Sequence, residues 1–134
     1  MQPWLRRLHL ALAWVFVLTV LVQVFLAGMA LFADRGYWQD HISFGHTVLA
    51  LAAVLVLLSA AAGRLPRSAI AWAALPLVGY IVQTILAGFR FSGPQEVAAL
   101  HPVGALVVFW IGILVARRAR RFLDQPAEAP SPAT

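Results

Sequence analysis

The sequence predicts an all-α integral membrane protein, a four-helix up-down bundle made of two parallel helical-hairpin repeats. Of its 134 residues, 62% are hydrophobic and only 11% are charged, which leaves too little polar surface for a soluble domain of this size. Four long apolar runs alternate with short polar segments. A heptapeptide also occurs twice, as VQVFLAG at residues 22–28 and as VQTILAG at residues 82–88, with five of seven residues identical. Such self-similarity predicts an internal repeat.

The first hairpin is predicted from two apolar runs and the loop between them. Residues 8–32 are almost continuously apolar and long enough to cross a core of about 30 Å. The run is too long for a signal peptide and lacks an Ala-x-Ala cleavage site at its end, so we expect a first spanning helix. Residues 33–41 then form a polar loop. Asp40 is the expected N-cap of a second span over residues 42–62.

The second hairpin follows the breakers Gly63 and Pro66. We expect a third span over residues 69–89, with a kink at Pro76, and a fourth over residues 97–116. Between them, Ser92 and Gln95 match a capping box. Residues 1–123 thus form one transmembrane domain. The polar, proline-rich residues 124–134 are expected to be a disordered tail.

The basic residues predict the orientation, because cytoplasmic loops of membrane proteins are enriched in Lys and Arg. All ten are arginines, and only Arg35 and Arg90 fall in the loops after the first and third spans. The other eight lie at the two ends or in the middle loop: Arg6, Arg7, Arg64, Arg67, Arg117, Arg118, Arg120 and Arg121. Both termini are therefore expected in the cytoplasm, and the two hairpins share one orientation.

Several function classes are excluded by composition. The chain has no cysteine, so disulfides, thiol catalysis, c-type haem attachment and iron–sulfur clusters are absent. The arginines gather at the ends of apolar runs, which argues against nucleic-acid binding. No catalytic constellation or phosphate loop is visible, so the sequence favours no enzyme activity, although it leaves the question open.

His46 and His101 are the candidate metal ligands. Each opens the apolar run that follows one copy of the repeated heptapeptide, and each lies six residues after an expected helix start, at Asp40 or Gln95. Helices 2 and 4 of such a bundle are diagonal, so we expect two imidazoles at matched height facing one central metal. Haem b held by two histidines fits this arrangement. The alternative is a pair of interfacial histidines without a ligand.

Further residues are predicted to line the same pocket from helices 1 and 3. Polar groups inside a span are costly and need an explanation. For the glutamines the alternative is an interhelical hydrogen bond. The glycines would leave room for a flat macrocycle, and the expected set is Gln23, Gln83, Gly28 and Gly88, with Gly45 and Gly104 nearer the histidines.

Four other charged or titratable residues are assigned from their positions. Arg90 lies on the outer side, where it could pair with a haem propionate, or it is simply solvated. Arg35 is expected to be a solvated interfacial residue, and His9 an interfacial residue near the cytoplasmic end. His41 is expected in the loop, with an outer-face metal site shared with His46 as an alternative.

The pattern resembles a known one. A Gln-x-x-Leu-Ala-Gly stretch on the odd helices, with a histidine near the outer start of the even helices, is similar to one four-helix half of haem A synthase. Apart from its tail, the chain also resembles a small bacterial membrane-protein family, the domain of unknown function 6220. The resemblance implies haem ligation by His46 and His101 and a place in the bacterial cytoplasmic membrane. The outer-loop motif tied to catalysis in the synthase is missing, since residues 33–41 have only Asp34 and Asp40 as carboxylates.

The sequence therefore favours a b-type, bis-histidine haem protein of the membrane. It would transfer electrons from a quinol or another membrane redox partner, or handle haem at the outer face, with the lipid bilayer around it and a homodimer as one arrangement. The alternative is a cofactor-free accessory subunit, in which the glutamines and small residues serve packing. A channel is disfavoured because residues 54–58 and 107–111 are apolar and would not line a water-filled pore.

Overall fold

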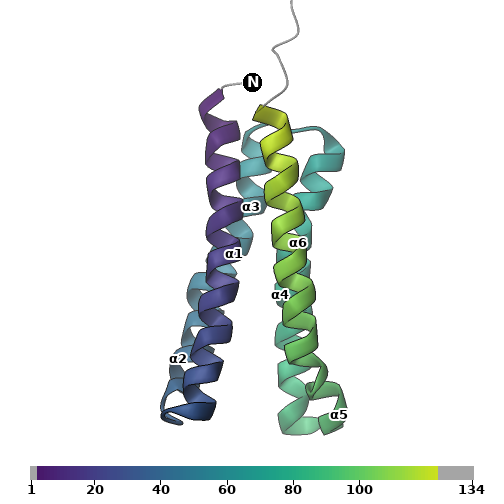
Figure 1. The fold of residues 1–134 in the computed structure, drawn as a ribbon. Coiled ribbons are helices and arrows are strands. Elements are labelled where there is room, and N and C mark those ends of the chain that lie inside the picture. The colour runs from purple at the N-terminus through teal and green to yellow at the C-terminus, as the bar shows by residue number, and fades with distance from the viewer. Residues whose placement is uncertain (1–2, 124–134) are drawn as a thin grey trace, which may run out of the picture.

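The computed structural model describes residues 3–123, and its first hairpin is formed by two long helical legs (Figure 1). The first leg is α1 (Pro3–Phe32). The second leg starts after a short turn and consists of α2 (Tyr37–Phe44), the π-helical turn η1 (Gly45–Leu49) and α3 (Ala50–Ala62). These apolar sequences are helical because a helix pairs its backbone polar groups within itself, as a lipid surrounding requires.

The second hairpin has the same order of legs. Its first leg is α4 (Arg67–Ser92), and its second consists of the short α5 (Gln95–Ala98) followed by α6 (Leu100–Leu123). Pro102 lies in the first turn of α6, where it lacks the N–H that would bond back to the preceding turn. This explains why α5 and α6 are separate helices.

The predicted all-α bundle of four membrane-spanning helices is confirmed for the described part of the chain. It contains four segments long and apolar enough to cross a membrane: Trp4–Phe32, Tyr37–Ala62, Arg67–Ser92 and Gln95–Leu123. The start of α1 and the end of α6 lie at the same end of the bundle (Figure 1). The chain is thus a multi-pass membrane protein by the length and composition of its helices. The predicted disordered tail, residues 124–134, lies outside the described residues.

The helix contacts follow from the up-down connections. α1 packs against α3 and α6, and α4 packs against the same two helices. The diagonal pairs are therefore α1 with α4 and α3 with α6, as predicted. α2 packs on α1, and α5 packs on α4, at the end of the bundle away from the termini.

The predicted helix caps are wrong. Asp40 lies in the first turn of α2, and the N-cap position is Gly36, without a side-chain cap. The turn is instead closed by Asp34, whose Oδ1 accepts a hydrogen bond from the Gly36 N–H. Ser92 ends α4, and the N-cap of α5 is Pro94, again without a side-chain cap. Because helix starts tolerate acidic residues both at the cap and in the first turn, residue type alone could not distinguish these positions.

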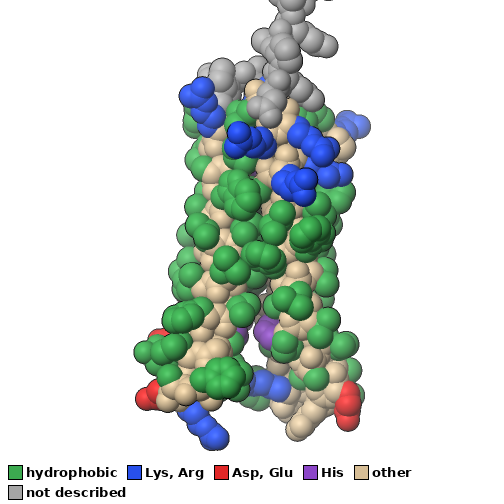
Figure 2. Space-filling view, in the orientation of Figure 1, with side chains coloured by type: hydrophobic (Ala, Val, Ile, Leu, Met, Phe, Trp, Pro, Cys, Tyr) green, Lys and Arg blue, Asp and Glu red, His purple; other side chains and the backbone are tan. Residues whose placement is uncertain are grey.

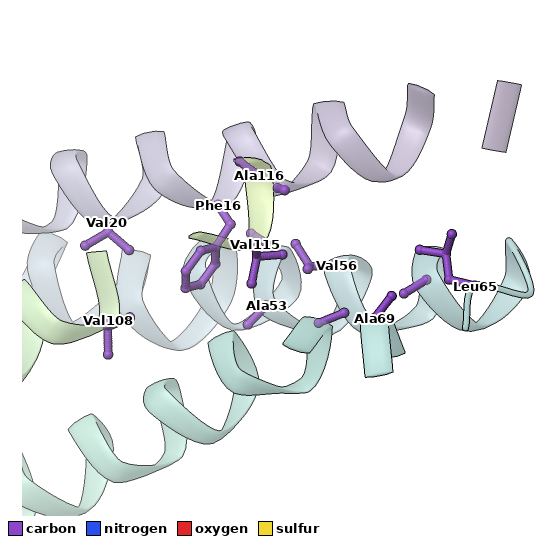
Figure 3. Close-up of a cluster of buried hydrophobic side chains, with 13 residues drawn as sticks. Phe16, Val20, Ala53, Val56, Leu65, Ala69, Val108, Val115 and Ala116 are labelled. Carbon is purple, nitrogen blue, oxygen red and sulfur yellow. The ribbon is translucent and has the colours of Figure 1, made fainter. Parts of the chain in front are cut away.

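The buried core lies at the end of the bundle that carries the termini (Figure 3). Phe16 of α1 is completely buried there, among small residues of α3 and α6. Seven of the thirteen residues in this cluster are alanines. Small side chains let membrane helices approach closely, and van der Waals packing is the main attraction between helices in lipid. We call this region the arginine end, because most arginines surround it (Figure 2).

The opposite end is more open. No residue of α2 or α5 is buried. Figure 1 shows the leg pair formed by α1 and α2 diverging from the pair formed by α4 and α6. In the space-filling view, histidine side chains lie in the hollow between the two hairpins (Figure 2). We call this region the histidine end.

Candidate functional site

Two histidines at the histidine end make the same contact in the two hairpins. The Nδ1 atom of His41 lies 3.0 Å from the backbone oxygen of Gln23, and the Nδ1 atom of His101 lies 3.0 Å from the backbone oxygen of Gln83. In both cases 18 residues separate the histidine from the glutamine. Each imidazole is thus held by the long helix of its own hairpin.

These hydrogen bonds determine which ring nitrogen is protonated. A backbone carbonyl oxygen can only accept, so Nδ1 must donate its N–H in both histidines. In the neutral imidazole, Nε2 then carries a lone pair. A carbonyl bound to the second ring nitrogen is also the usual way in which proteins orient a histidine that ligates a metal. Both rings are therefore prepared to act as Nε2 donors.

The two rings face one another across the gap between the hairpins. The ring centroids of His41 and His101 are 6.3 Å apart, and the ring planes are inclined by 79°. Trp38 packs its edge against His41, with centroids 5.5 Å apart. A metal about 2 Å from each Nε2, and about 1 Å more from each nitrogen to its ring centroid, would give a centroid separation of roughly 6 Å. The observed centroid separation is close to this value.

The side-chain amides of both glutamines also lie at the histidine end. The Gln23 Nε2 atom donates to the backbone oxygen of His41 at 2.9 Å and lies 3.3 Å from the His41 Nε2. The Gln23 Oε1 and both amide atoms of Gln83 are buried without a hydrogen-bond partner. Burying such groups unpaired costs about 1–3 kcal/mol each. The Nε2 lone pair of His41 accepts from the Gln23 amide, whereas Gln83 makes no such bond to His101.

Two glycines make space for these amides. A Cβ atom added at Gly45 would lie 2.7 Å from the Gln23 Nε2, and one added at Gly104 would lie 2.6 Å from the Gln83 Nε2. Gly45 follows His41 by four residues, whereas Gly104 follows His101 by three. The Gly45 N–H still bonds to the His41 oxygen, as in an α-helix, and residues three and four positions apart lie on the same face of a helix. The two glycines thus have the same role despite the difference in spacing.

The remaining predicted pocket residues, Gly28, Gly88 and Arg90, are less closely packed. A Cβ atom at Gly28 or Gly88 would meet nothing within 4 Å, so both glycines face open space. Arg90 is exposed, with its guanidinium 4.3 Å from the centroid of the Phe91 ring.

His46 is not placed as its predicted role requires. Its Nδ1 lies 3.3 Å from the hydroxyl oxygen of Tyr80, and the side chain is exposed. The ring that contacts His101 is that of His41. The matched-height argument failed because the second leg begins at Tyr37, so that His41 lies within helix α2 and not in a loop.

His9 also differs from its prediction. It is 4% exposed, and its Nδ1 lies 2.9 Å from the hydroxyl of Ser59, which in turn donates to the backbone oxygen of Val56. His9 is thus a buried residue of the arginine end and not an interfacial one. This pair is separate from the histidine end and joins α1 to α3.

One sequence signal could have identified His41. The distance from Gln23 to Gln83 is 60 residues, and so is the distance from His41 to His101, whereas His46 and His101 are 55 residues apart. The residue types after His46 resemble those after His101 more closely, and this likeness was misleading. From Gly45 onward the offset is 59, as between Gly45 and Gly104, so that His46 corresponds to Ala105.

Residues 3–123 contain no group of three or more His, Asp or Glu side chains that could hold a metal ion. No curated protein and no solved structure matches the chain. The resemblance to haem A synthase therefore stays an expectation from the sequence. The model of a family of unknown function, DUF6220, matches residues 23–90, just over half of the chain, from Gln23 to Arg90. The chain belongs to this family of unknown function.

Proposed function

We propose that this protein is a membrane haem protein in which His41 and His101 would hold a b-type haem. One observation carries the proposal: two imidazoles from different hairpins, each oriented by a glutamine backbone carbonyl, face each other with centroids 6.3 Å apart. Haem is favoured over a bare ion because its macrocycle supplies four of the six donors, so that two histidines complete the coordination.

The surroundings of the two rings support the same proposal. Gly28 and Gly88 follow Gln23 and Gln83 by five residues, and no side chain lies within 4 Å of a Cβ added at either, so neither glycine obstructs a bound group. The unpaired amide atoms of Gln23 and Gln83 offer hydrogen bonds to a polar edge of the bound group. Arg90, at the same end, can pair with a propionate, since the guanidinium fork matches a carboxylate.

When bound, a haem of this kind supplies one-electron transfer. The residues of the chain would hold and orient it: the two Nε2 lone pairs bind, and the Nδ1–H bonds to the glutamine carbonyls prevent the rings from turning. We further propose that the two hairpins are related repeats and that both termini lie in the cytoplasm of a bacterium. The bound haem would exchange electrons with a quinol or another membrane redox partner, or the protein would deliver haem. The arginine distribution supports the orientation.

One observation favours the cofactor-free alternative. The Gln23 amide already contacts both the backbone oxygen and the Nε2 of His41, so hairpin 1 satisfies much of its own polarity. An accessory subunit that uses these contacts for packing would need no further group at the site. Gln83 argues against this, because its amide makes no equivalent bond to His101.

The test is the visible spectrum of the full-length protein purified in detergent from haem-replete cells. The wild type should contain haem that dithionite reduces to a low-spin b-type spectrum. His41→Ala and His101→Ala should each lower the haem-to-protein ratio by more than the roughly 10–100-fold typical for loss of an outer partner alone.

His46→Ala is the matched control. It removes a histidine of the same hairpin that lies against Tyr80, and the spectrum should stay that of the wild type. A colourless wild type would leave the accessory subunit as the better account. Loss of haem in His46→Ala with retention in His41→Ala would reverse the assignment of the ligand.

A further inference from the structure

A second hollow lies at the arginine end, between the start of α4 and the last turns of α6. It measures about 270 Å³ and is lined by Ser68, Ala69, Trp72, Arg118, Arg121 and Phe122. The guanidinium carbon of Arg118 lies 3.8 Å from the centroid of the Trp72 ring. This cation–π contact holds a half-buried guanidinium in one orientation. The hollow therefore presents two positive charges and a hydroxyl at a fixed place.

The same helix pair forms an apolar groove farther along. This groove also measures about 270 Å³ and lies between residues 75–83 of α4 and residues 104–111 of α6. On α4, Trp72, Leu75 and Gly79 are spaced by three and four residues. On α6, Val107, Ile111 and Arg118 are spaced by four and seven residues. Residues at such spacings lie on one face of a helix. The basic hollow and the apolar groove are thus on the same side of the seam between α4 and α6.

The dimensions of this seam fit one lipid leaflet. Arg118 and Val107 are eleven residues apart, which is about 16 Å along a helix. One leaflet of hydrocarbon is about 15 Å thick, half of the usual core. A molecule with an anionic head in the basic hollow could therefore lay one acyl chain along the groove.

We infer that this seam binds an anionic phospholipid, with its phosphate held by Arg118, Arg121 and Ser68 and an acyl chain against Leu75, Val78 and Val107. Arginine is suited to bidentate phosphate contacts, and basic pockets between membrane helices bind anionic headgroups. A free phosphate ion would use the hollow alone, whereas a phospholipid uses the hollow and the groove together. The basic hollow shares no residue with the histidine end, and the groove meets that end only at Gln83 and Gly104.

The test is native mass spectrometry of the full-length protein titrated with phosphatidylglycerol, with phosphatidylcholine of the same chains, and with inorganic phosphate. The wild type should bind phosphatidylglycerol at least about tenfold more tightly than phosphatidylcholine. The double variant Arg118→Gln/Arg121→Gln should lose this preference, because it removes both charges of the hollow.

The matched control is Arg117→Gln/Arg120→Gln, which removes the same charge from the same helix turns but outside the hollow. It should retain the preference for phosphatidylglycerol. Equal losses in both double variants would reduce the effect to diffuse charge and overturn the proposal, and so would displacement of the lipid by millimolar phosphate.

Two further variants keep the inference testable if Arg118→Gln/Arg121→Gln does not fold. Arg118→Lys retains the charge but loses the planar fork over Trp72, and should weaken binding severalfold. Val78→Trp fills the exposed groove and should weaken long-chain more than short-chain phosphatidylglycerol. If Val78→Trp affected neither, the acyl chain would lie elsewhere and the phospholipid assignment would be wrong.

Discussion

The arginine end and the histidine end of this bundle use the same four legs for opposite purposes. At the arginine end, Phe16 fills the space between small side chains of the neighbouring helices, and the hydrogen bond between His9 and Ser59 is buried. At the histidine end, the hairpins diverge, and the side chains between them are two imidazoles and two amides instead of alanines.

The comparison shows how a small membrane protein can separate stability from binding. Close packing of small side chains joins the hairpins at one end, because van der Waals contacts are the main attraction available in lipid. Since the hairpins are already joined there, the other end can keep unpaired polar groups and open space. This space is what a bound group would need.

The largest difference between the two ends is expected in the unfolding free energy lost when a phenylalanine is replaced by alanine. Phe16→Ala removes a side chain that is 0% exposed, and should lower the free energy of unfolding by about 3–5 kcal/mol through lost packing and the cavity left behind. Phe25 is on the same helix but 63% exposed, so Phe25→Ala should change the free energy of unfolding by less than about 0.5 kcal/mol. Unfolding in mixed detergent and SDS measures both. Similar losses would show that the two ends pack alike.

A smaller difference is expected for histidine. His9→Ala breaks the buried bond to Ser59 and should cost about 1–3 kcal/mol of unfolding free energy. His46→Ala removes an exposed side chain and should be nearly neutral. In a double-mutant cycle, His9→Ala and Ser59→Ala should couple by about 0.6 kcal/mol, the average for polar pairs in membranes. A coupling of zero would contradict the bond as a link between α1 and α3.

The smallest difference is expected between two glycines of the first hairpin. Gly28→Ala meets open space and should stabilise α1 by about 0.5–1 kcal/mol through helix propensity. Gly45→Ala displaces the Gln23 amide from His41, and the loss of about 1 kcal/mol should offset that gain. Unfolding free energies that differ by about 1 kcal/mol are therefore expected. Equal values would mean that the Gln23 amide contributes nothing at the histidine end.

Much of the fold could be predicted because the membrane restricts the choice. Residues 8–32, 42–62, 69–89 and 97–116 were recognisable as spans from apolar length alone, and the diagonal order followed from the short connections. Helix ends were harder, because Asp40 and Ser92 suit both a cap and a neighbouring turn. The left-handed residue of the middle turn was also unforeseeable, since Arg64, with φ of 49°, takes the conformation that Gly63 would accept more easily.

For the candidate site, the sequence by itself determined which residue types were available: two copies of a glutamine–glycine stretch and four histidines in a chain without cysteine. It identified His101 and both glutamines as candidates, but it could not determine which histidine faces His101. Only the tertiary structure decided this. The second leg starts at Tyr37, so His41 lies within α2 and its ring contacts that of His101, while His46 lies in η1 and its ring contacts Tyr80. Between the histidine and the glycine, the first hairpin also has one residue more than the second. A single extra residue rotates a helix by about 100°, which is enough to exchange one face for another.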